Sequence, residues 1–528
     1  MQSTSQFPCA CGVVSASVVP QSAMHAASGG VYRARTGCLL LVVVFLGGPG
    51  CRQAVAPTSI AVAHEADTVS TDPVLVDDSA SHSILSNIYE GLVCFDRDMA
   101  LRPALAVGWS HSDERTLLLE LRKGVRFHDG TPLQAEEVRR ALERARDPGS
   151  ATRRHFGTVE AVETTGEHSL RLTTSKADPL LINRLTYVLI GRESASSALV
   201  GTGPYRLVRW DRGHHLEAEA FADYWGGRPA IDRVRFVPAQ EETRSIEALR
   251  EGGLDLLRFV PETLVAQLRS VPRVRVVSRA GVSSYYLWLN ASARDLQGRT
   301  PFADRRVRQA ISLAIDREVI VSRLGGNGVP LRQLVPRGIF GHVAQLPELR
   351  FDPQEASRLL KDAGYRGGFD MALSHRPQTS LRVVAETLQG MLGRVGIRLS
   401  LESPEWPEML SGWAAARLPF FLAAWRFENG DAHSFLLDCV MTRDPVRNLG
   451  ENNPGFSSPR LDRLIEEHTE IVQDTERLAH YQRLMEVAIE ELPLVPLFTR
   501  TYLYGVSERL RWEPRLDGKL LVAEMSLN

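Results

Sequence analysis

Residues 117–148 read LLLELRKGVRFHDGTPLQAEEVRRALERARDP, and this stretch decides the fold. Leu117, Leu119 and Leu121 recur at every second position, which predicts a strand with one buried face. The segment Asp129–Pro132 (DGTP) predicts a turn, because glycine tolerates a positive φ and proline restricts its own. Beyond the turn, apolar residues at helical spacing predict an amphipathic helix, and these residues are Val138, Ala141, Leu142 and Ala145.

The size and charge of the chain bound the remaining possibilities. A chain of 528 residues is too long for one hydrophobic core and predicts two or three lobes. Its apolar content of 44% and charged content of 24% are those of an ordinary globular protein. The sequence has 62 basic and 63 acidic residues, and this balance of charge argues against a polyanionic partner such as nucleic acid.

The N-terminal region has the pattern of an export signal. Arg33 and Arg35 precede the apolar run Cys38–Leu46 (CLLLVVVFL), and small residues follow it. Nine residues are too few to span about 30 Å of hydrocarbon as a helix. Residues 1–23 lack the pattern, so Met24 is an alternative to the first residue as the start of translation.

Residues 1–56 are expected to form the export signal and tether, and this leader can be processed in two ways. Cys51 follows the apolar run as the lipidated cysteine of a bacterial lipoprotein would, although the preceding Gly48–Gly50 lacks the leucine that a lipobox prefers. Cleavage after Ala54–Ala56 would instead release a free periplasmic protein. Both alternatives place the protein outside the cytoplasmic membrane, and a lipid on Cys51 would be its one contact with the membrane.

Two cysteines remain beyond Cys51. Cys94 and Cys439 lie far apart in the sequence, and a disulfide between them is one possibility in an oxidising compartment. We favour the alternative that they are two isolated buried thiols.

Several further motifs follow in a fixed order. They are Gly201–Arg209 (GTGPYRLVR), Tyr224–Pro229 (YWGGRP) and Phe302–Ile320 (FADRRVRQAISLAIDREVI). Together with residues 117–148, they resemble family 5 of the bacterial extracellular solute-binding proteins, from about Ser59 to the C-terminus. The resemblance implies an α/β fold of the periplasmic-binding-protein type, in its large three-domain form. Such a two-lobed "Venus flytrap" closes over a solute, here a peptide, nickel complex or similar compound, for an ABC importer.

The resemblance also implies how the chain is divided. Lobe I is expected to contain residues 57–92, 199–281 and 494–528. Lobe II is expected to span residues 93–198, and lobe III residues 282–493.

Three local signals predict where helices begin and end. Asp352 as N-cap, followed by Pro353 and closed by Gly364, delimits a helix. Gln134 stands where the family tends to have a threonine N-cap, a loss of about 1 kcal/mol. Apolar residues on one face predict another helix over Ile84–Leu92.

Sequence motifs of catalysis and of cofactor or metal binding are missing. There is no P-loop, no H-E-x-x-H and no G-x-S-x-G, and Gly325–Gly328 lacks the P-loop lysine and is read as a turn. His214 and His215 would point to opposite faces of a strand, and His128 is read as structural. We therefore expect no catalytic residues, no enzyme activity, no cofactor and no metal.

Two charged residues are the candidates for binding a zwitterionic solute. A desolvated peptide needs a carboxylate for its ammonium group and a guanidinium for its carboxylate. Trp425–Asp431 (WRFENGD) resembles the stretch whose acidic residue binds the peptide amino group in the dipeptide-binding branch of the family. By position that residue is Glu428, with Asp431 as the alternative, and Arg376 matches the branch's carboxylate-binding arginine. The other interpretation is that Glu428 and Arg376 are solvated loop charges.

Two tryptophans are candidates for lining the same cleft. Trp406 and Trp425 offer broad aromatic contact to a ligand, and packing in the core is the alternative for both. The sequence thus predicts a monomeric extracytoplasmic protein that delivers a small peptide or peptide-like solute to an ABC permease and its ATPase subunits. A non-peptide solute (a metal chelate, a sugar or an opine-like compound) and a sensory role are the alternatives.

Overall fold

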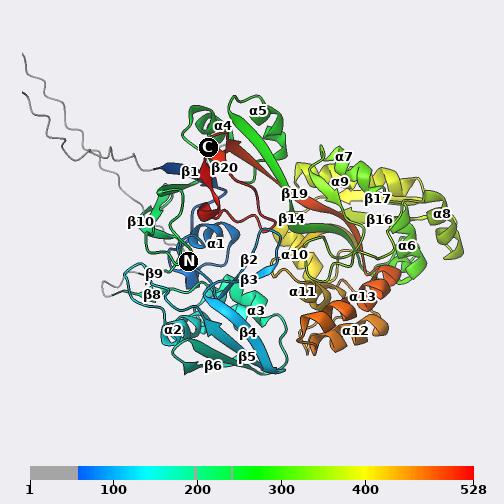
Figure 1. Ribbon diagram of the computed structural model, residues 1–528. Coiled ribbons are helices and arrows are strands. Elements are labelled where there is room, and N and C mark those ends of the chain that lie inside the picture. The colour runs from blue at the N-terminus through cyan, green and yellow to red at the C-terminus, as the bar shows by residue number, and fades with distance from the viewer. Residues whose placement is uncertain (1–57, 195–198, 240–241) are drawn as a thin grey trace, which may run out of the picture. The chain divides into compact units, whose positions relative to one another are not determined.

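The computed structural model describes residues 58–194, 199–239 and 242–528 (Figure 1). Residues Ala56–Asn528 form one compact unit, to which everything below refers. The predicted leader and the lipidation of Cys51 lie outside the described residues and stay predictions. None of the described helices has both the length and the apolar character needed to cross a bilayer. The division into lobes I, II and III also stays a prediction, and we use these terms only as names for the residue ranges given above.

A large mixed sheet runs through the unit (Figure 1). Pairing is parallel among β12, β1 and β13 and among β18, β16 and β17, and it is antiparallel elsewhere. The order of its strands is β10 (Tyr205–Asp211), β11 (His215–Ala220), β12 (Arg233–Pro238), β1 (Ser59–His64), β13 (Leu256–Leu257), β19 (Leu494–Ser507), β14 (Val274–Leu289), β18 (Phe420–Arg426), β16 (Phe369–Ser374) and β17 (Ile397–Glu402), with β15 (Gly328–Pro330) also paired to β19.

The two longest strands, β14 and β19, pair at the boundary between lobe I and lobe III. Strand β14 crosses the boundary between Gly281 and Val282, and the chain returns to lobe I at the start of β19. The two strands pair from Val274 opposite Ser507 to Trp288 opposite Leu494. Their pairing shifts register between Ala280 and Ser284. Gly281 lies in this irregular stretch, and a Cβ atom there would overlap the ring of Tyr502. Glycine is therefore needed at the point where β14 passes from one lobe to the other.

We predict that Gly281→Ala lowers the free energy of unfolding by about 1–3 kcal/mol, because the added methyl forces the tightly packed Tyr502 ring to move. Gly108→Ala is the matched control, since a Cβ at Gly108 meets nothing within 4 Å. Urea unfolding of both variants tests this. Equal stability of the two variants would contradict the close packing at Gly281.

Lobe II contains a separate four-stranded sheet, which confirms the prediction for residues 117–148. Alternate leucines of β5 and one face of α2 (Ala135–Arg146) are buried in a shared core. Gln134 is the N-cap of α2 and forms no side-chain capping bond, as expected. The order of the strands is β4 (Ala106–Asp113), β5 (Thr116–Leu121), β7 (Ser169–Thr174) and β6 (Val159–Gly166).

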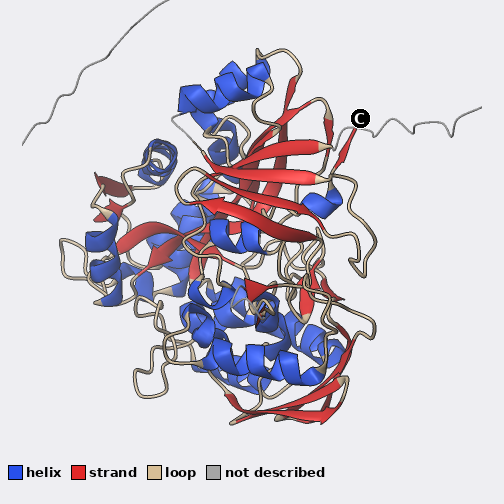
Figure 2. Cartoon of the chain, turned by 90° about the vertical axis from the view of Figure 1, so that its left-hand side faces the viewer, coloured by secondary structure: helices blue, strands red, loops and turns tan. Residues whose placement is uncertain are grey.

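Helices cover both faces of the large sheet in lobe III (Figure 1). Helices also flank the strands seen from the side of Figure 2. Leu287 of β14 packs in the core that α6, α7 and α9 share, and its neighbour Trp288 packs in the core of α10, α12 and α13. The bounds of the helices are α1 (Ser79–Leu85), α3 (Leu181–Arg184), α4 (Glu242–Glu251), α5 (Val265–Arg269), α6 (Arg305–Leu313), α7 (Arg317–Arg323), α8 (Pro353–Asp362), α9 (Thr379–Gly393), α10 (Trp406–Ala414), α11 (His433–Phe435), α12 (Pro459–Thr469) and α13 (Asp474–Glu491). Short strand pairs complete the fold, namely β2 (Val93–Phe95) with β3 (Leu101–Pro103), β8 (Arg192–Glu193) with β9 (Leu199–Val200), and β20 (Leu510–Arg511) with β21 (Ser526–Leu527).

The helix predicted to begin after Asp352 is confirmed as α8, whereas the helix predicted over residues 84–92 is not confirmed. The Asp352 carboxylate accepts a hydrogen bond from the Glu355 amide at 2.9 Å, and α8 begins as predicted. By contrast, α1 ends at Leu85, so the helix predicted over residues 84–92 is wrong. The Asn87 side chain donates to the carbonyls of Ser83, Ile84 and Leu520, which fixes the chain in a turn there.

The two cysteines within the described residues are free, so no disulfide joins them. Cys439 is buried, as expected of an isolated core thiol. Cys94 is exposed, which corrects the prediction that both thiols are buried. The reason is the alternation of β2, which turns Cys94 away from the core that its two neighbours enter.

Three histidines of lobe III form a buried row. The ring of His468 lies 5.4 Å from that of His433 and 5.3 Å from that of His480, centroid to centroid. Neither ring nitrogen of His468 has a hydrogen-bond partner. Burial lowers the pKa of His468 to about 2 and that of His433 to about 4, so both rings are neutral in the folded protein. The positive charge of Arg477 lowers both values further.

We predict that His468→Phe stabilises the protein more at pH 5 than at pH 7.5. The pKa of His468 is lower in the folded protein than its value of about 6.5 in the unfolded chain. The free energy of unfolding is therefore unaffected by this group above about pH 6.5. Below that pH the unfolded chain takes up the proton, and the free energy of unfolding falls by at most about 1.4 kcal/mol per pH unit. Phenylalanine keeps the ring and removes this proton linkage. Urea unfolding at both pH values tests it, with exposed His214→Phe as control. An equal gain at both pH values would contradict the prediction.

Candidate ligand-binding site

The two predicted anchors follow neighbouring parallel strands. Arg376 comes after β16 and Glu428 after β18, and Ser374 pairs with Phe421. Parallel strands present their carboxyl ends at one edge of a sheet, where ligands bind in open α/β folds. Strand β18 continues five residues past Phe421 to Arg426, whereas β16 ends at Ser374, and both anchors lie in the chain that follows these strands. Neither a hydrogen bond nor an ion pair joins the described side chains of Arg376 and Glu428.

Glu428 lies in a cluster of charges contributed by three lobes. Its side chain is 32% exposed and lies 3.5 Å from the Arg154 guanidinium of lobe II and 3.8 Å from that of Arg426. Arg154 also forms an ion pair of 2.6 Å with Asp77 of lobe I. The Tyr187 hydroxyl donates to the Glu428 carbonyl at 3.0 Å. The carboxylate is therefore held in place from lobe II and still reaches solvent.

Arg376 is half-buried and available to an acidic ligand. Its guanidinium lies over the ring of Trp406, 4.9 Å from the ring centroid, and Trp406 is 36% exposed. Among the residues that the structure describes, no carboxylate forms an ion pair with Arg376. A guanidinium stacked on an aromatic face keeps its donors free for a bidentate carboxylate.

A tyrosine lies near Arg376. The ring of Tyr285 stacks on Phe498 at 4.8 Å between centroids. Burial raises the pKa of the Tyr285 hydroxyl, while the nearby cations Arg500 and Arg376 lower it. The hydroxyl is therefore protonated at neutral pH.

Asp431 and Trp425 take part in the packing of lobe III. The buried Asp431 carboxylate forms an ion pair of 2.5 Å with Arg477, and it accepts hydrogen bonds from the Tyr481 hydroxyl and the His433 amide. Trp425 is half-buried and packs against Phe435. These contacts account for both residues without a ligand.

We predict that Asp431→Asn lowers the free energy of unfolding by about 3 kcal/mol, because it leaves the buried Arg477 charge without its closest partner. Glu428→Gln should change it by no more than about 0.5 kcal/mol, since this side chain is partly solvated. Chemical unfolding of both variants separates the two roles. A larger loss in Glu428→Gln would reverse the assignment.

Other residues of this region escaped the sequence analysis. Arg426 donates to the Tyr502 hydroxyl at 3.2 Å and to the Asp517 carbonyl at 3.4 Å, which joins lobe III to lobe I. Arg426 stands two residues before Glu428, and that proximity was the available signal. Arg154 and Tyr187 carry no such signal, because only folding brings them to Glu428.

The loop that carries Glu428 also borders a cavity of about 550 Å³ between lobes II and III. Gly430 and Asp431 line it from lobe III, and His111 and Asn183 from lobe II. In the part of the chain that the structure describes, no three His, Cys, Asp or Glu residues are grouped so as to hold a metal ion. The polar groups available here suit an organic solute.

Comparison with known proteins decides the family. The sequence pattern described as "Bacterial extracellular solute-binding proteins, family 5 Middle" matches residues 100–442. The chain belongs to this family. The glutathione-binding protein GsiB of Shigella dysenteriae is 24% identical over 498 residues, which cover 90% of this chain and 95% of GsiB.

Solved structures with the fold of this family 5 protein agree with the α/β periplasmic-binding-protein architecture. The unliganded open form of MppA, a periplasmic murein tripeptide binding protein, has a TM-score of 0.79 at 19% identity, covering 90% of this chain and 98% of MppA. AgaA from A. tumefaciens R10, in complex with agropinic acid, has a TM-score of 0.65 at 24% identity, covering 89% and 99%. At such identities the likeness concerns the fold, and the predicted fold class is confirmed.

Proposed function

We propose that this family 5 protein captures a small zwitterionic, peptide-like solute and delivers it to an ABC permease driven by separate ATPase subunits. The observation that carries the proposal is the placement of two opposite charges along one sheet edge. Arg376 has no acidic partner among the described residues, and Glu428 keeps part of its carboxylate in solvent. A zwitterion supplies the complementary pair of charges.

Each anchor has a distinct role in this proposal. Arg376, with its guanidinium oriented by Trp406, forms a two-pronged contact with the carboxylate of the solute. The Glu428 carboxylate binds the ammonium group of the solute. This ammonium group competes with the guanidinium groups of Arg154 and Arg426 for the Glu428 carboxylate. Lobes I and III close over the solute by bending β14 and β19, and the solute leaves chemically unchanged.

The names of relatives support a peptide-like solute and keep one alternative open. GsiB binds glutathione and MppA a murein tripeptide. AgaA was solved with agropinic acid, which favours a non-peptide solute as the second candidate. We also propose that the protein acts outside the cytoplasmic membrane as a monomer, anchored through a lipid on Cys51.

A binding screen tests the function. The panel contains free di- and tripeptides, glutathione, end-blocked peptides, a nickel chelate and several sugars. A ligand at 100 times its Kd stabilises by about 2.7 kcal/mol, which is a few degrees in Tm for a chain of this size. We predict a shift with free peptides that disappears when either end is blocked. A shift with another solute and none with any peptide would overturn the peptide assignment.

Substitution of the two anchors tests their roles. We predict that Arg376→Ala and Glu428→Ala each weaken binding of the best free peptide by about 10- to 100-fold, the effect of losing one charge-assisted hydrogen bond. The Tm of the ligand-free protein should change little.

Arg382→Ala and Glu386→Ala are the matched controls, because this ion pair of 2.9 Å lies on the exposed face of α9. Isothermal titration calorimetry measures the affinities. Unchanged affinity in both anchor variants would remove the pair from the site.

A further inference from the structure

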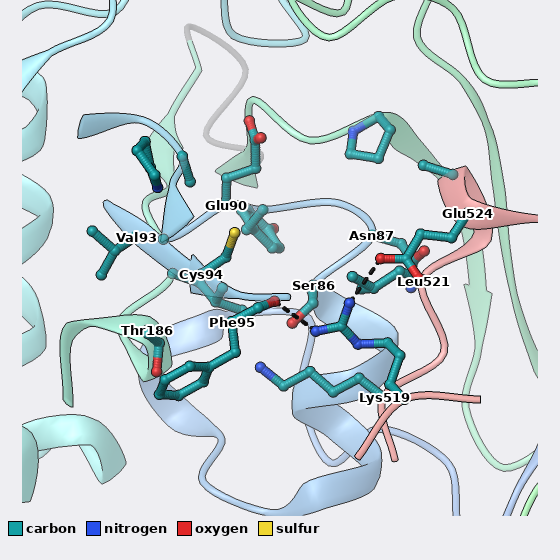
Figure 3. Close-up of a pocket in the computed structure, with 18 of the residues that line it drawn as sticks. Ser86, Asn87, Glu90, Val93, Cys94, Phe95, Thr186, Lys519, Leu521 and Glu524 are labelled. Atoms are coloured by element: carbon teal, nitrogen blue, oxygen red, sulfur yellow. Dashed lines mark hydrogen bonds and ion pairs between the residues drawn. The ribbon is translucent and has the colours of Figure 1, made fainter. Parts of the chain in front are cut away.

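A partly open pocket of about 280 Å³ lies where lobes I and II meet (Figure 3). We call it the junction pocket. The segment after α1, strand β2 and the C-terminal segment form its walls. Most of its lining is apolar, including Val93, Phe95, Pro103, Ala104, Leu189 and Leu521. The pocket is thus suited to a small ligand with a hydrocarbon part.

One positive charge of the pocket forms no ion pair with the described residues, although the Asp517 carboxylate lies near enough to raise its pKa. Lys519 is one of four lysines in the sequence, and the other three (Lys123, Lys176 and Lys361) are exposed. Over the described ranges 58–194, 199–239 and 242–528, no acidic side chain forms an ion pair with its ammonium group. The ammonium nitrogen lies over the face of the Tyr187 ring, 5.3 Å from its centroid. Burial lowers the pKa of Lys519 to about 8, so the group is still mostly charged at pH 7.

The other charged groups of the pocket are already paired. Arg515 donates to the Glu524 carboxylate at 2.7 Å and to the Phe95 carbonyl at 2.6 Å (Figure 3). Glu90 accepts hydrogen bonds from Trp225 and Thr202, and from Tyr224. A buried charge without a hydrogen-bonding counterion is costly to the fold. Lys519 is therefore the group in this pocket that a ligand would satisfy.

We propose that the junction pocket is a second ligand site, which binds a small amphipathic monocarboxylate through the ammonium group of Lys519. The carboxylate supplies the missing acceptor, and a short hydrocarbon tail fills the apolar remainder of the cavity. This second site is independent of the solute proposed for Arg376 and Glu428.

The pocket is connected to the Glu428 loop through one side chain. Tyr187 lies over Lys519 with its ring and donates its hydroxyl to the Glu428 carbonyl. A carboxylate on Lys519 would neutralise the charge that faces this ring. Occupancy of the junction pocket thus acts on a residue that holds the loop of Glu428.

The thiol of Cys94 provides a local readout, because it lines the pocket and is exposed. The experiment measures the rate at which N-ethylmaleimide labels Cys94 at pH 7, with peptide mapping by mass spectrometry to separate it from other cysteines. Hexanoate is the probe, and hexanol and hexylamine are the neutral and cationic controls of equal chain length. At ten times its Kd, hexanoate should slow labelling about tenfold, and hexanol and hexylamine should not.

Lysine variants identify the charge that is responsible. In Lys519→Met the protection by hexanoate should disappear, while the exposed Lys361→Met should behave as the unmodified protein. Protection is compared with and without hexanoate within each variant, because loss of a cation also changes the reactivity of the thiol itself. Equal protection by hexanoate and hexanol, or no protection by hexanoate, overturns the proposal even if Lys519→Met fails to fold.

Discussion

The pairing of β14 with β19 is the constraint on which the rest of the structure depends. Strand β14 runs from lobe I into lobe III, and β19 pairs with it from Val274 to Trp288 except in the stretch between Ala280 and Ser284. Any closing motion between these lobes must therefore bend this strand pair instead of a loose linker. The register shift near Gly281 is where the ladder of hydrogen bonds is already interrupted, so bending costs least there.

The same pair sets the position of the candidate site. Strand β18 adds to β14, and β16 adds to β18, so that Glu428 and Arg376 end up along one edge. Lobe II then brings Arg154 to the Glu428 carboxylate and the Tyr187 hydroxyl to the Glu428 carbonyl, and Asp77 of lobe I pairs with Arg154. The charges of the candidate site thus come from segments that are hundreds of residues apart, and folding brings them together.

Local features could be predicted from the sequence because they depend on neighbouring residues. The strand, turn and helix of residues 117–148 and the N-cap Asp352 belong to this class. The helix expected over residues 84–92 failed because buried apolar residues also occur in irregular chain, which here is fixed by the Asn87 side chain. The sequence also left Glu428 and Asp431 as alternatives, since the ion pair of Asp431 with Arg477 forms only in the folded chain. Lys519 carried no signal at all, because its surroundings come from three distant segments.

We infer that this family 5 protein closes lobes I and III over its solute by bending β14 and β19. Calorimetry first establishes the concentration at which a ligand saturates the protein. Small-angle X-ray scattering of the free and the saturated protein then tests whether the lobes close. The account predicts a smaller radius of gyration in the saturated protein. An unchanged radius with the ligand bound would contradict it.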